Sequence, residues 1–248
     1  MALRTSVRWV LLLVVLATPS AAPLRTVLFF ETHQEQRSET LPDGSLLHLN
    51  AHTKLVAEIS PLSRHVTLLQ GETRFHVQKD LKRPFIVDTQ HARVRALGTT
   101  FNVRISARDT DVTLLEGRVA VSKLVDHETM RSGTLELEAG QNVRIKSNGA
   151  MAFAQGRTAH EANAWPRLVI AFRAAKLSEV VAEVNRYRDH PLIIQDARLA
   201  AMTITGSLNV FESESFWDSL EKSNNIRIER REDGATLLAP ADILNGRP

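Results

Sequence analysis

The fold of this chain is decided by the stretch Val94-Arg95-Ala96-Leu97-Gly98-Thr99-Thr100-Phe101-Asn102-Val103. On both sides of Gly98, apolar residues alternate with polar ones, which is the period of a strand with one buried face. Glycine has no Cβ, so Gly98 permits a sharp corner or a bulge between two strands. The stretch therefore predicts two strands that meet at Gly98.

The same strand–glycine–strand unit recurs over residues 37–146, and we expect one β domain there. Its corner glycines follow one another after 27, 27, 19 and 23 residues; they are Gly44, Gly71, Gly98, Gly117 and Gly140. Recurrence every ~20–50 residues is typical of stacked coils. We predict a twisted, solenoid-like stack of hairpins, with a β-sandwich as the alternative. Residues 24–37 are interpreted as a linker or a first strand.

Composition limits the classes of function. The 248 residues suffice for one large β domain or two smaller domains, and a hydrophobic content of 43% indicates a folded protein. The formal net charge of +3 is too weak to indicate nucleic-acid binding. Cysteine is absent, which excludes disulfides and thiol chemistry.

Residues 1–24 predict either a signal peptide or a single membrane anchor. Arg4 and Arg8 precede the apolar run Trp9–Ala17, and small residues and two prolines follow it. The run is shorter than the ~20 residues of a spanning helix, and both alternatives stay open. The basic residues place the start of the chain in the cytoplasm and the rest across the membrane.

Residues 147–164 are polar and without a period, so we interpret them as a linker, and residues 165–240 as a small α+β domain. A helix ending near Tyr187 is indicated by apolar residues at helical spacing, namely Leu177, Val180, Val181 and Val184. Ser213 can cap a second helix. The predicted order is β-α-β-β-α-β plus a last strand, with two helices on one face of a sheet.

No residue is assigned to catalysis, to a cofactor or to a metal. Glu72 and Glu116 each flank a corner glycine, so a catalytic carboxylate pair is conceivable. We favour a structural role in which these carboxylates bind backbone N–H groups of the turns. His48 and His52 are four residues apart, but in a strand region this spacing does not bring two metal ligands together.

A basic face is predicted on the central hairpin from Arg93, Arg95 and Arg104. We favour a solvated surface for it over an anion-binding site.

Six short motifs occur in order, and together they resemble the periplasmic FecR domain: Leu41-Pro42-Asp43-Gly44-Ser45, Gly71-Glu72-Thr73-Arg74-Phe75-His76-Val77, Arg83-Pro84-Phe85-Ile86-Val87, Ala96-Leu97-Gly98-Thr99-Thr100-Phe101-Asn102-Val103, Leu115-Glu116-Gly117-Arg118-Val119 and Ala139-Gly140-Gln141. The resemblance marks a set of residues as structural, namely Gly44, Gly71, Glu72, Phe75, Leu97, Gly98, Thr99, Phe101, Glu116, Gly117 and Gly140. Residues 165–240 are similar to the C-terminal region of the same family, which is like the N-terminal domains of secretins and TonB-dependent receptors.

The resemblance implies a regulator of iron–siderophore uptake that is not an enzyme. Such proteins sit in the inner membrane with one spanning helix and bind the signalling domain of a TonB-dependent outer-membrane transporter in the periplasm. Their cytoplasmic domain controls an extracytoplasmic-function sigma factor, as anti-sigma factor or activator. Only about eight residues precede the apolar run here, so we expect a sigma-factor partner only if such a domain is encoded upstream.

Two alternatives from other classes accompany this expectation. One is a stand-alone periplasmic scaffold or ligand-binding module, secreted to the periplasm if the N-terminal segment is cleaved. The other is a hydrolase of cell-wall polymer that uses Glu72 or Glu116, for which the sequence offers little.

The partner surface is predicted at an open sheet edge of the C-terminal domain, because two small α+β domains can join by pairing edges. Edges that stay unpaired usually carry charges, and residues 226–231 carry several. No charge occurs in the strand that we choose as the docking edge, Met202, Thr203, Ile204 and Thr205. The alternative is that this strand is central in its sheet, where charges are absent for another reason.

Overall fold

The computed structural model describes residues 25–106, 109–125, 128–129, 133–154, 169–210, 214–224 and 226–241. The chain divides into two compact units, residues 1–33 with 37–156 and residues 34–36 with 157–248. We call the first the β unit and the second the α+β unit.

The β unit contains two large sheets. One sheet has the strand order β1 (Thr26–Glu31), β4 (Lys54–Ile59), β5 (Arg64–Gln70), β7 (Phe85–Asp88), β8 (Ala92–Ala96), β11 (Arg118–Val125) and β12 (Glu128–Thr129), with β13 (Leu135–Glu138) also beside β11. The other has the order β2 (Arg37–Thr40), β3 (Leu46–Leu49), β6 (Glu72–His76), β9 (Thr100–Ile105), β10 (Asp109–Glu116), β14 (Asn142–Lys146) and β15 (Met151–Phe153).

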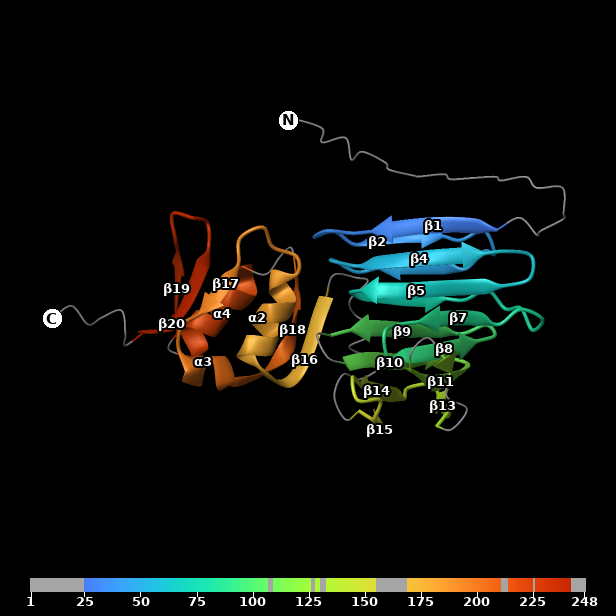
Figure 1. Cartoon of the computed structure of the whole chain (residues 1–248). Coiled ribbons are helices and arrows are strands. Elements are labelled where there is room, and N and C mark those ends of the chain that lie inside the picture. The colour runs from blue at the N-terminus through green and yellow to red at the C-terminus, as the bar shows by residue number, and fades with distance from the viewer. Residues whose placement is uncertain are drawn as a thin grey trace, which may run out of the picture. The chain divides into compact units, whose positions relative to one another are not determined.

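In both sheets the strands follow one another in chain order, and Figure 1 shows them stacked in this way. The paired strands are antiparallel, except that β5 and β7 run parallel. Because the chain moves back and forth between the sheets as the stack grows, the β unit combines two facing sheets with a solenoid-like progression. The predicted mainly-β class with a stack of hairpins is confirmed.

The corner glycines mark the places where the chain changes sheet. Gly71 lies between β5 and β6 and Gly98 between β8 and β9, and both have positive φ, 88° and 149°. A Cβ on Gly71 would lie 2.5 Å from the His52 carbonyl oxygen, and one on Gly98 would lie 2.8 Å from Lys79 Cα. Both positions therefore require glycine for conformation and for space. Gly117 and Gly140 stand at similar changes of sheet, whereas Gly44 lies in the β2–β3 hairpin.

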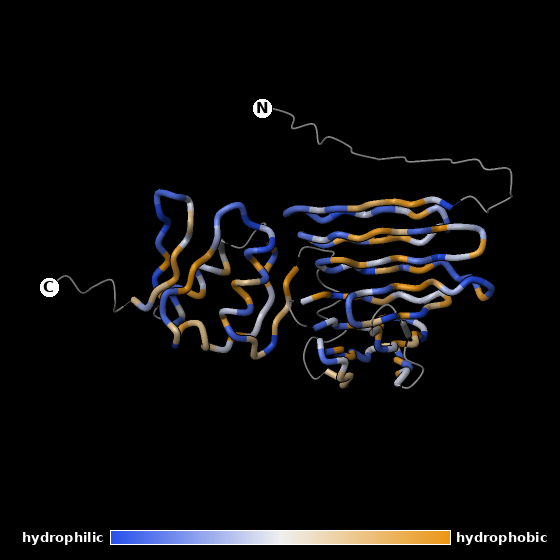
Figure 2. The backbone as a smooth tube through the Cα atoms, in the orientation of Figure 1, coloured by the Kyte–Doolittle hydropathy of each residue, from blue (hydrophilic) through white to orange (hydrophobic). Residues whose placement is uncertain are grey.

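The core of the β unit lies between its two sheets, because alternate residues of every strand point inward. Figure 2 shows the resulting alternation of apolar and polar residues along the strands. At the centre, Phe75 stacks on Phe101 with 5.0 Å between ring centroids and meets Phe85 at 6.0 Å. All three rings are fully buried. The motif residues Phe75 and Phe101 are thus core residues from two neighbouring strands.

Two segments outside residues 37–146 join the sheets of the β unit. β1 pairs with β4 along its whole length, which agrees with a first strand rather than a linker. β15 pairs with β14, so the prediction that residues 147–164 form an irregular linker is wrong for residues 151–153. The cause is a tight turn at Asn148-Gly149, where Lys146 N–H donates to Ala150 O and Gly149 has a φ of 79°. Residues 155–164 lie outside the described residues.

The α+β unit contains three helices and two small sheets in its described part. Its elements are β16 (Val169–Lys176), α2 (Leu177–Asn185), β17 (Leu192–Ile194), α3 (Ala197–Ala201), β18 (Thr203–Asn209), α4 (Glu214–Asn224), β19 (Ile226–Arg230) and β20 (Thr236–Pro240). β16 pairs with β18, and β20 lies between β17 and β19. The predicted order is confirmed, with α3 as an addition.

The two long helices do not cover one face of a single sheet, so that prediction is wrong. α2 contacts both β16 and β17, which belong to different sheets. α4 contacts β19, and its Phe216 meets Phe172 of β16 edge-on at 5.6 Å. The helices thus lie between the two sheets, as Figure 1 shows. Between β17 and β18 the chain forms α3, which Asp196 caps by accepting from the N–H groups of Arg198 and Leu199. The predicted cap Ser213 and Trp165 lie outside the described residues.

Candidate functional site

Glu72 lies in a buried polar cluster and not in an open site. Its side chain is fully buried, and its two carboxylate oxygens accept hydrogen bonds from the amides of Asn50 (3.0 Å) and Asn102 (2.8 Å). Arg104 Nη1 lies 3.8 Å from Glu72 Oε2. The carboxylate therefore ties together three strand regions through these side-chain contacts, which is a structural role.

Glu116 lies far from Glu72. In the sheet, Glu72 is opposite Arg104 and Glu116 is opposite Thr100, which are four residues apart on β9. At a rise of ~3.3 Å per residue, and with β6 and β10 on opposite sides of β9 at ~4.8 Å each, the Cα atoms of the two residues are roughly 16 Å apart. Paired carboxylates of glycoside hydrolases stand about 5–9.5 Å apart. With Glu72 also closed to solvent, the two residues do not form a hydrolytic pair.

The three arginines predicted as one basic face are on different sheets. Arg93 and Arg95 belong to β8, whereas Arg104 belongs to β9 and lies near Glu72. Arg93 forms two hydrogen bonds of 2.7 Å with the carboxylate of Asp88, and His65 Nε2 lies 2.8 Å from the same carboxylate. Burial opposes ionisation of Asp88, but these hydrogen bonds and charges outweigh it and hold its pKa below the ordinary value.

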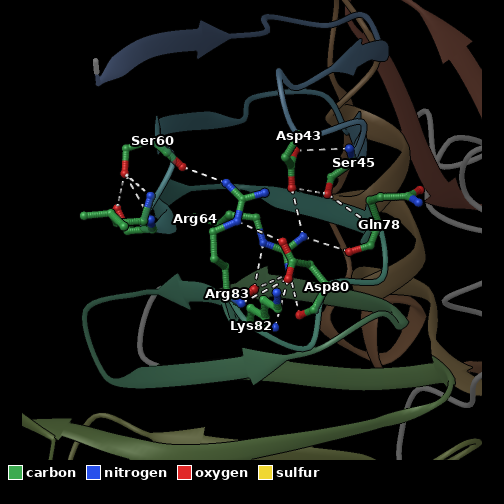
Figure 3. Close-up of polar contacts among 10 residues, drawn as sticks. Asp43, Ser45, Ser60, Arg64, Gln78, Asp80, Lys82 and Arg83 are labelled. Carbon is green, nitrogen blue, oxygen red and sulfur yellow. Dashed lines mark hydrogen bonds and ion pairs between the residues drawn. The ribbon is translucent and has the colours of Figure 1, made fainter. Parts of the chain in front are cut away.

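A second buried cluster centres on Arg64, which the sequence analysis did not single out (Figure 3). Arg64 Nη1 lies 3.1 Å from Asp43 Oδ2, and both side chains are almost completely buried. The guanidinium also donates to the carbonyls of Gln78 (2.7 Å) and Arg83 (2.9 Å from Nε). Asp43 in turn accepts from the N–H and the hydroxyl of Ser45. The Asp43-Gly44-Ser45 motif is thus part of a clamp on the loop between β6 and β7.

The predicted docking edge is found at the start of β18. Met202 caps α3 and precedes the strand, and Thr203–Thr205 belong to β18. β18 pairs with β16 and has no second neighbour among the described strands. Its sequence, TITGSLN, contains no charge, whereas the edge strand β19 exposes Arg227, Glu229 and Arg230.

The backbone geometry shows which groups of β18 face the open side. Leu177 N–H donates to Met202 O at 2.7 Å. In antiparallel pairs, hydrogen-bonded and non-hydrogen-bonded pairs alternate, so the next pair, Thr203 with Lys176, is non-hydrogen-bonded. The N–H of Thr203 therefore points away from β16. Farther along, Thr205 Oγ1 accepts from Ala174 N–H at 2.9 Å, where β16 has a bulge.

The described residues contain no group of three or more His, Asp or Glu side chains arranged to hold a metal ion. No helix in the described part of the chain is long and apolar enough to cross a membrane. The apolar run Trp9–Ala17 lies outside that part.

This two-unit arrangement defines a class of protein, a stacked-hairpin β domain followed by a small α+β domain. Residues 30–120 match the model of the FecR family, described as FecR protein, which confirms the predicted FecR domain. Two crystal structures of a proposed anti-sigma factor from Parabacteroides distasonis are similar to the whole arrangement. One has 26% identity and a TM-score of 0.70 over 87% of this chain and 99% of that chain. The other has 25% identity and a TM-score of 0.70 over 85% and 97%. The comparison with curated proteins gave no match.

Proposed function

We propose that this chain is a periplasmic signal-relay regulator that binds the signalling domain of a TonB-dependent outer-membrane transporter. Through that contact it transmits iron–siderophore status toward an extracytoplasmic-function sigma factor. The FecR match and the two structural neighbours support a regulatory, non-enzymatic class. The observation that carries the choice of partner surface is the uncharged edge of β18, with Thr203 N–H directed outward.

Docking at this edge has a simple physical basis. An incoming strand forms backbone hydrogen bonds with β18, and these make little demand on the sequence of the partner. The exposed side chains of Thr203 and Thr205 leave room for a strand beside them and bring no charge to the interface. At the edge strand β19, three charged side chains would have to be desolvated, which disfavours pairing there. β18 is therefore preferred over β19 as the docking edge.

The test is titration calorimetry with the purified chain and the purified signalling domains of the TonB-dependent transporters of its source organism. Thr203→Pro removes the outward N–H, and we expect affinity about fivefold lower, since a hydrogen bond contributes about 1 kcal/mol. Proline is compatible with the site because Met202 has the extended conformation (φ −60°, ψ 132°) that residues before proline prefer. Thr203→Ala is the matched control, because it removes the side chain and retains the N–H.

Circular dichroism shows whether the proline variant is folded. A folded Thr203→Pro chain that binds with full strength would exclude β18 as the docking edge. Equal weakening by Thr203→Ala and Thr203→Pro would assign the effect to the side chain and contradict docking through the backbone.

A further inference from the structure

Three leucines project into solvent from neighbouring turns at one end of the β unit. Leu62 is 74% exposed, Leu81 is 71% exposed and Leu97 is 41% exposed. We call these three residues the leucine tip. Leu62 and Leu81 are the two most exposed large apolar side chains of the described residues, so the leucine tip is a candidate contact surface.

Both outer leucines are held at the apex of a hydrogen-bonded turn. Around Leu62, Ser60 N–H donates to Ser63 O at 2.8 Å, and Ser60 Oγ accepts from the N–H groups of Leu62 and Ser63. Around Leu81, Asp80 Oδ1 accepts from the N–H groups of Lys82 and Arg83. The turns therefore present their leucines outward in a fixed conformation.

The turns of the leucine tip are also fixed to one another. Arg83 Nη1 donates to Ser60 O at 2.8 Å, which joins the turn of Leu81 to the turn of Leu62 (Figure 3). Asp80 N–H donates to the Leu97 carbonyl at 3.0 Å, which joins it to the corner at Gly98. The buried guanidinium of Arg64 supports the turn of Leu81 from below through the Arg83 carbonyl. The three leucines thus lie on turns that are hydrogen-bonded to one another.

The charge around Leu62 and Leu81 is basic on balance, whereas Glu116 places an exposed carboxylate near the corner of Leu97. The carboxylate of Asp80 is paired with Arg83 at 2.8 Å, and Glu58 next to the first turn is paired with Arg25. Lys79 and Lys82 are exposed beside Leu81 and add positive charge to this balance. Exposed leucines on turns with lysines beside one of them fit an anionic lipid surface, in which leucines enter the acyl boundary and lysines meet the headgroups. A protein partner would need a groove of matching shape.

β1 begins at this end of the β unit. Thr26 of β1 is opposite Ile59 of β4, which directly precedes the turn of Leu62. Eight residues lie between Ala17, the last residue of the apolar run, and Thr26, so the chain takes nine Cα-to-Cα steps from one to the other. An extended chain of that length spans at most ~32 Å. A membrane that holds the run therefore lies within this reach of Thr26, which is opposite the end of the strand that leads into the turn of Leu62.

We infer that the leucine tip docks the β unit on the anionic phospholipid surface of the membrane that receives the N-terminal segment. Leu62 and Leu81 insert at the level of the headgroups, and Lys79 and Lys82 contact lipid phosphates. This inference concerns the β unit and is independent of the docking edge at β18.

The experiment uses the full chain reconstituted into vesicles of phosphatidylethanolamine and phosphatidylglycerol. Since the chain has no cysteine, Leu62→Cys and Leu81→Cys can each carry one environment-sensitive fluorophore. We expect a blue shift of the emission, quenching by doxyl-labelled lipid and protection from aqueous iodide. Leu69→Cys is the matched control, because Leu69 is 59% exposed at the opposite end of β5, and its label should respond to iodide alone.

A second arm tests the charges. Replacing both Lys79 and Lys82 by Gln should lower the ratio of docked to undocked chains by up to about 30-fold, at ~1 kcal/mol for each lysine near an anionic surface. Lys146→Gln, an exposed lysine at the other end of the unit, should change nothing. Labels at Leu62 and Leu81 that respond to iodide as the Leu69 label does would overturn the inference. The inference would also be overturned, in favour of a protein contact, if the emission of these labels did not respond to lipid but shifted when a transporter signalling domain was added.

Discussion

The buried pair of Arg64 and Asp43 should be one of the strongest single contributions to the stability of the β unit. Breaking a buried ion pair by removing one partner typically costs about 3–5 kcal/mol, because the other charge stays buried and uncompensated. Arg64→Met leaves the Asp43 carboxylate, 1% exposed, without its cation and deprives the carbonyls of Gln78 and Arg83 of a donor. We therefore expect a loss of about 5 kcal/mol for Arg64→Met.

Asp43→Asn should lower the free energy of unfolding by less, about 3 kcal/mol. The asparagine oxygen can still accept from Ser45, and Arg64 retains its carbonyl partners. The double variant should lose clearly less than the sum of the two single losses, since no uncompensated charge is left in it. Arg118→Met, at an exposed arginine of β11, is the control and should be within about 0.5 kcal/mol of the unsubstituted chain.

The assay is urea unfolding followed by far-ultraviolet circular dichroism, with the free energy obtained by linear extrapolation. A loss below about 1 kcal/mol for Arg64→Met would refute the reasoning, because surface pairs contribute that little. Strict additivity in the double variant would show that the two side chains do not act as a pair.

Three further outcomes follow from the geometry. Gly98→Val should lower the stability of the β unit by about 2–4 kcal/mol, because a side chain at positive φ would also collide with Lys79, and an unchanged melting temperature would contradict this. Glu72→Gln should lower the free energy of unfolding by about 2 kcal/mol, because its amide group would face the amide donors whose hydrogen bonds the carboxylate now accepts. An unchanged free energy of unfolding would show that the cluster is not stabilising. Asp88 has a lowered pKa in the folded state, so the stability from its contacts with Arg93 is present above the unfolded pKa of ~3.9 and is lost as pH falls through the folded pKa. The Asp88→Asn variant should therefore be less stable than the unsubstituted chain at pH 7, and its free energy of unfolding should fall less between pH 5 and pH 2. Parallel curves of stability against pH for the two chains would contradict this.

Much of the β unit could be predicted from the sequence, because apolar and polar residues alternate along its strands and each strand buries one face. Strand period and positive-φ glycine are local properties, and the corner at Gly98 is found where the alternation on both sides breaks. The Arg64 clamp was missed because it depends on a contact between residues that are far apart in the sequence. Arg64 is in phase with Val66 and Leu68, which assigns it to the buried face, but its partner Asp43 is 21 residues away and no local signal joins the two.

In the α+β unit the elements could be predicted but their assembly could not. The helical spacing that ends at Val184 correctly indicated α2. No period states which strands pair, so the division into a two-stranded and a three-stranded sheet was beyond the sequence pattern. α3 has five residues, too few for a periodic signal, and it was not predicted; its capping residue Asp196 is a local feature that could have indicated it.

The central claim is that the chain relays a signal through backbone contact at β18, and amide hydrogen exchange tests it most directly. The purified chain is compared with and without the transporter signalling domain that binds it in calorimetry. The account predicts slower exchange in the peptides that cover Thr203–Asn209, above all at the outward N–H of Thr203, with little change in β19. Protection of β19 instead, or bound complexes in which exchange across β18 is unchanged, would contradict the account.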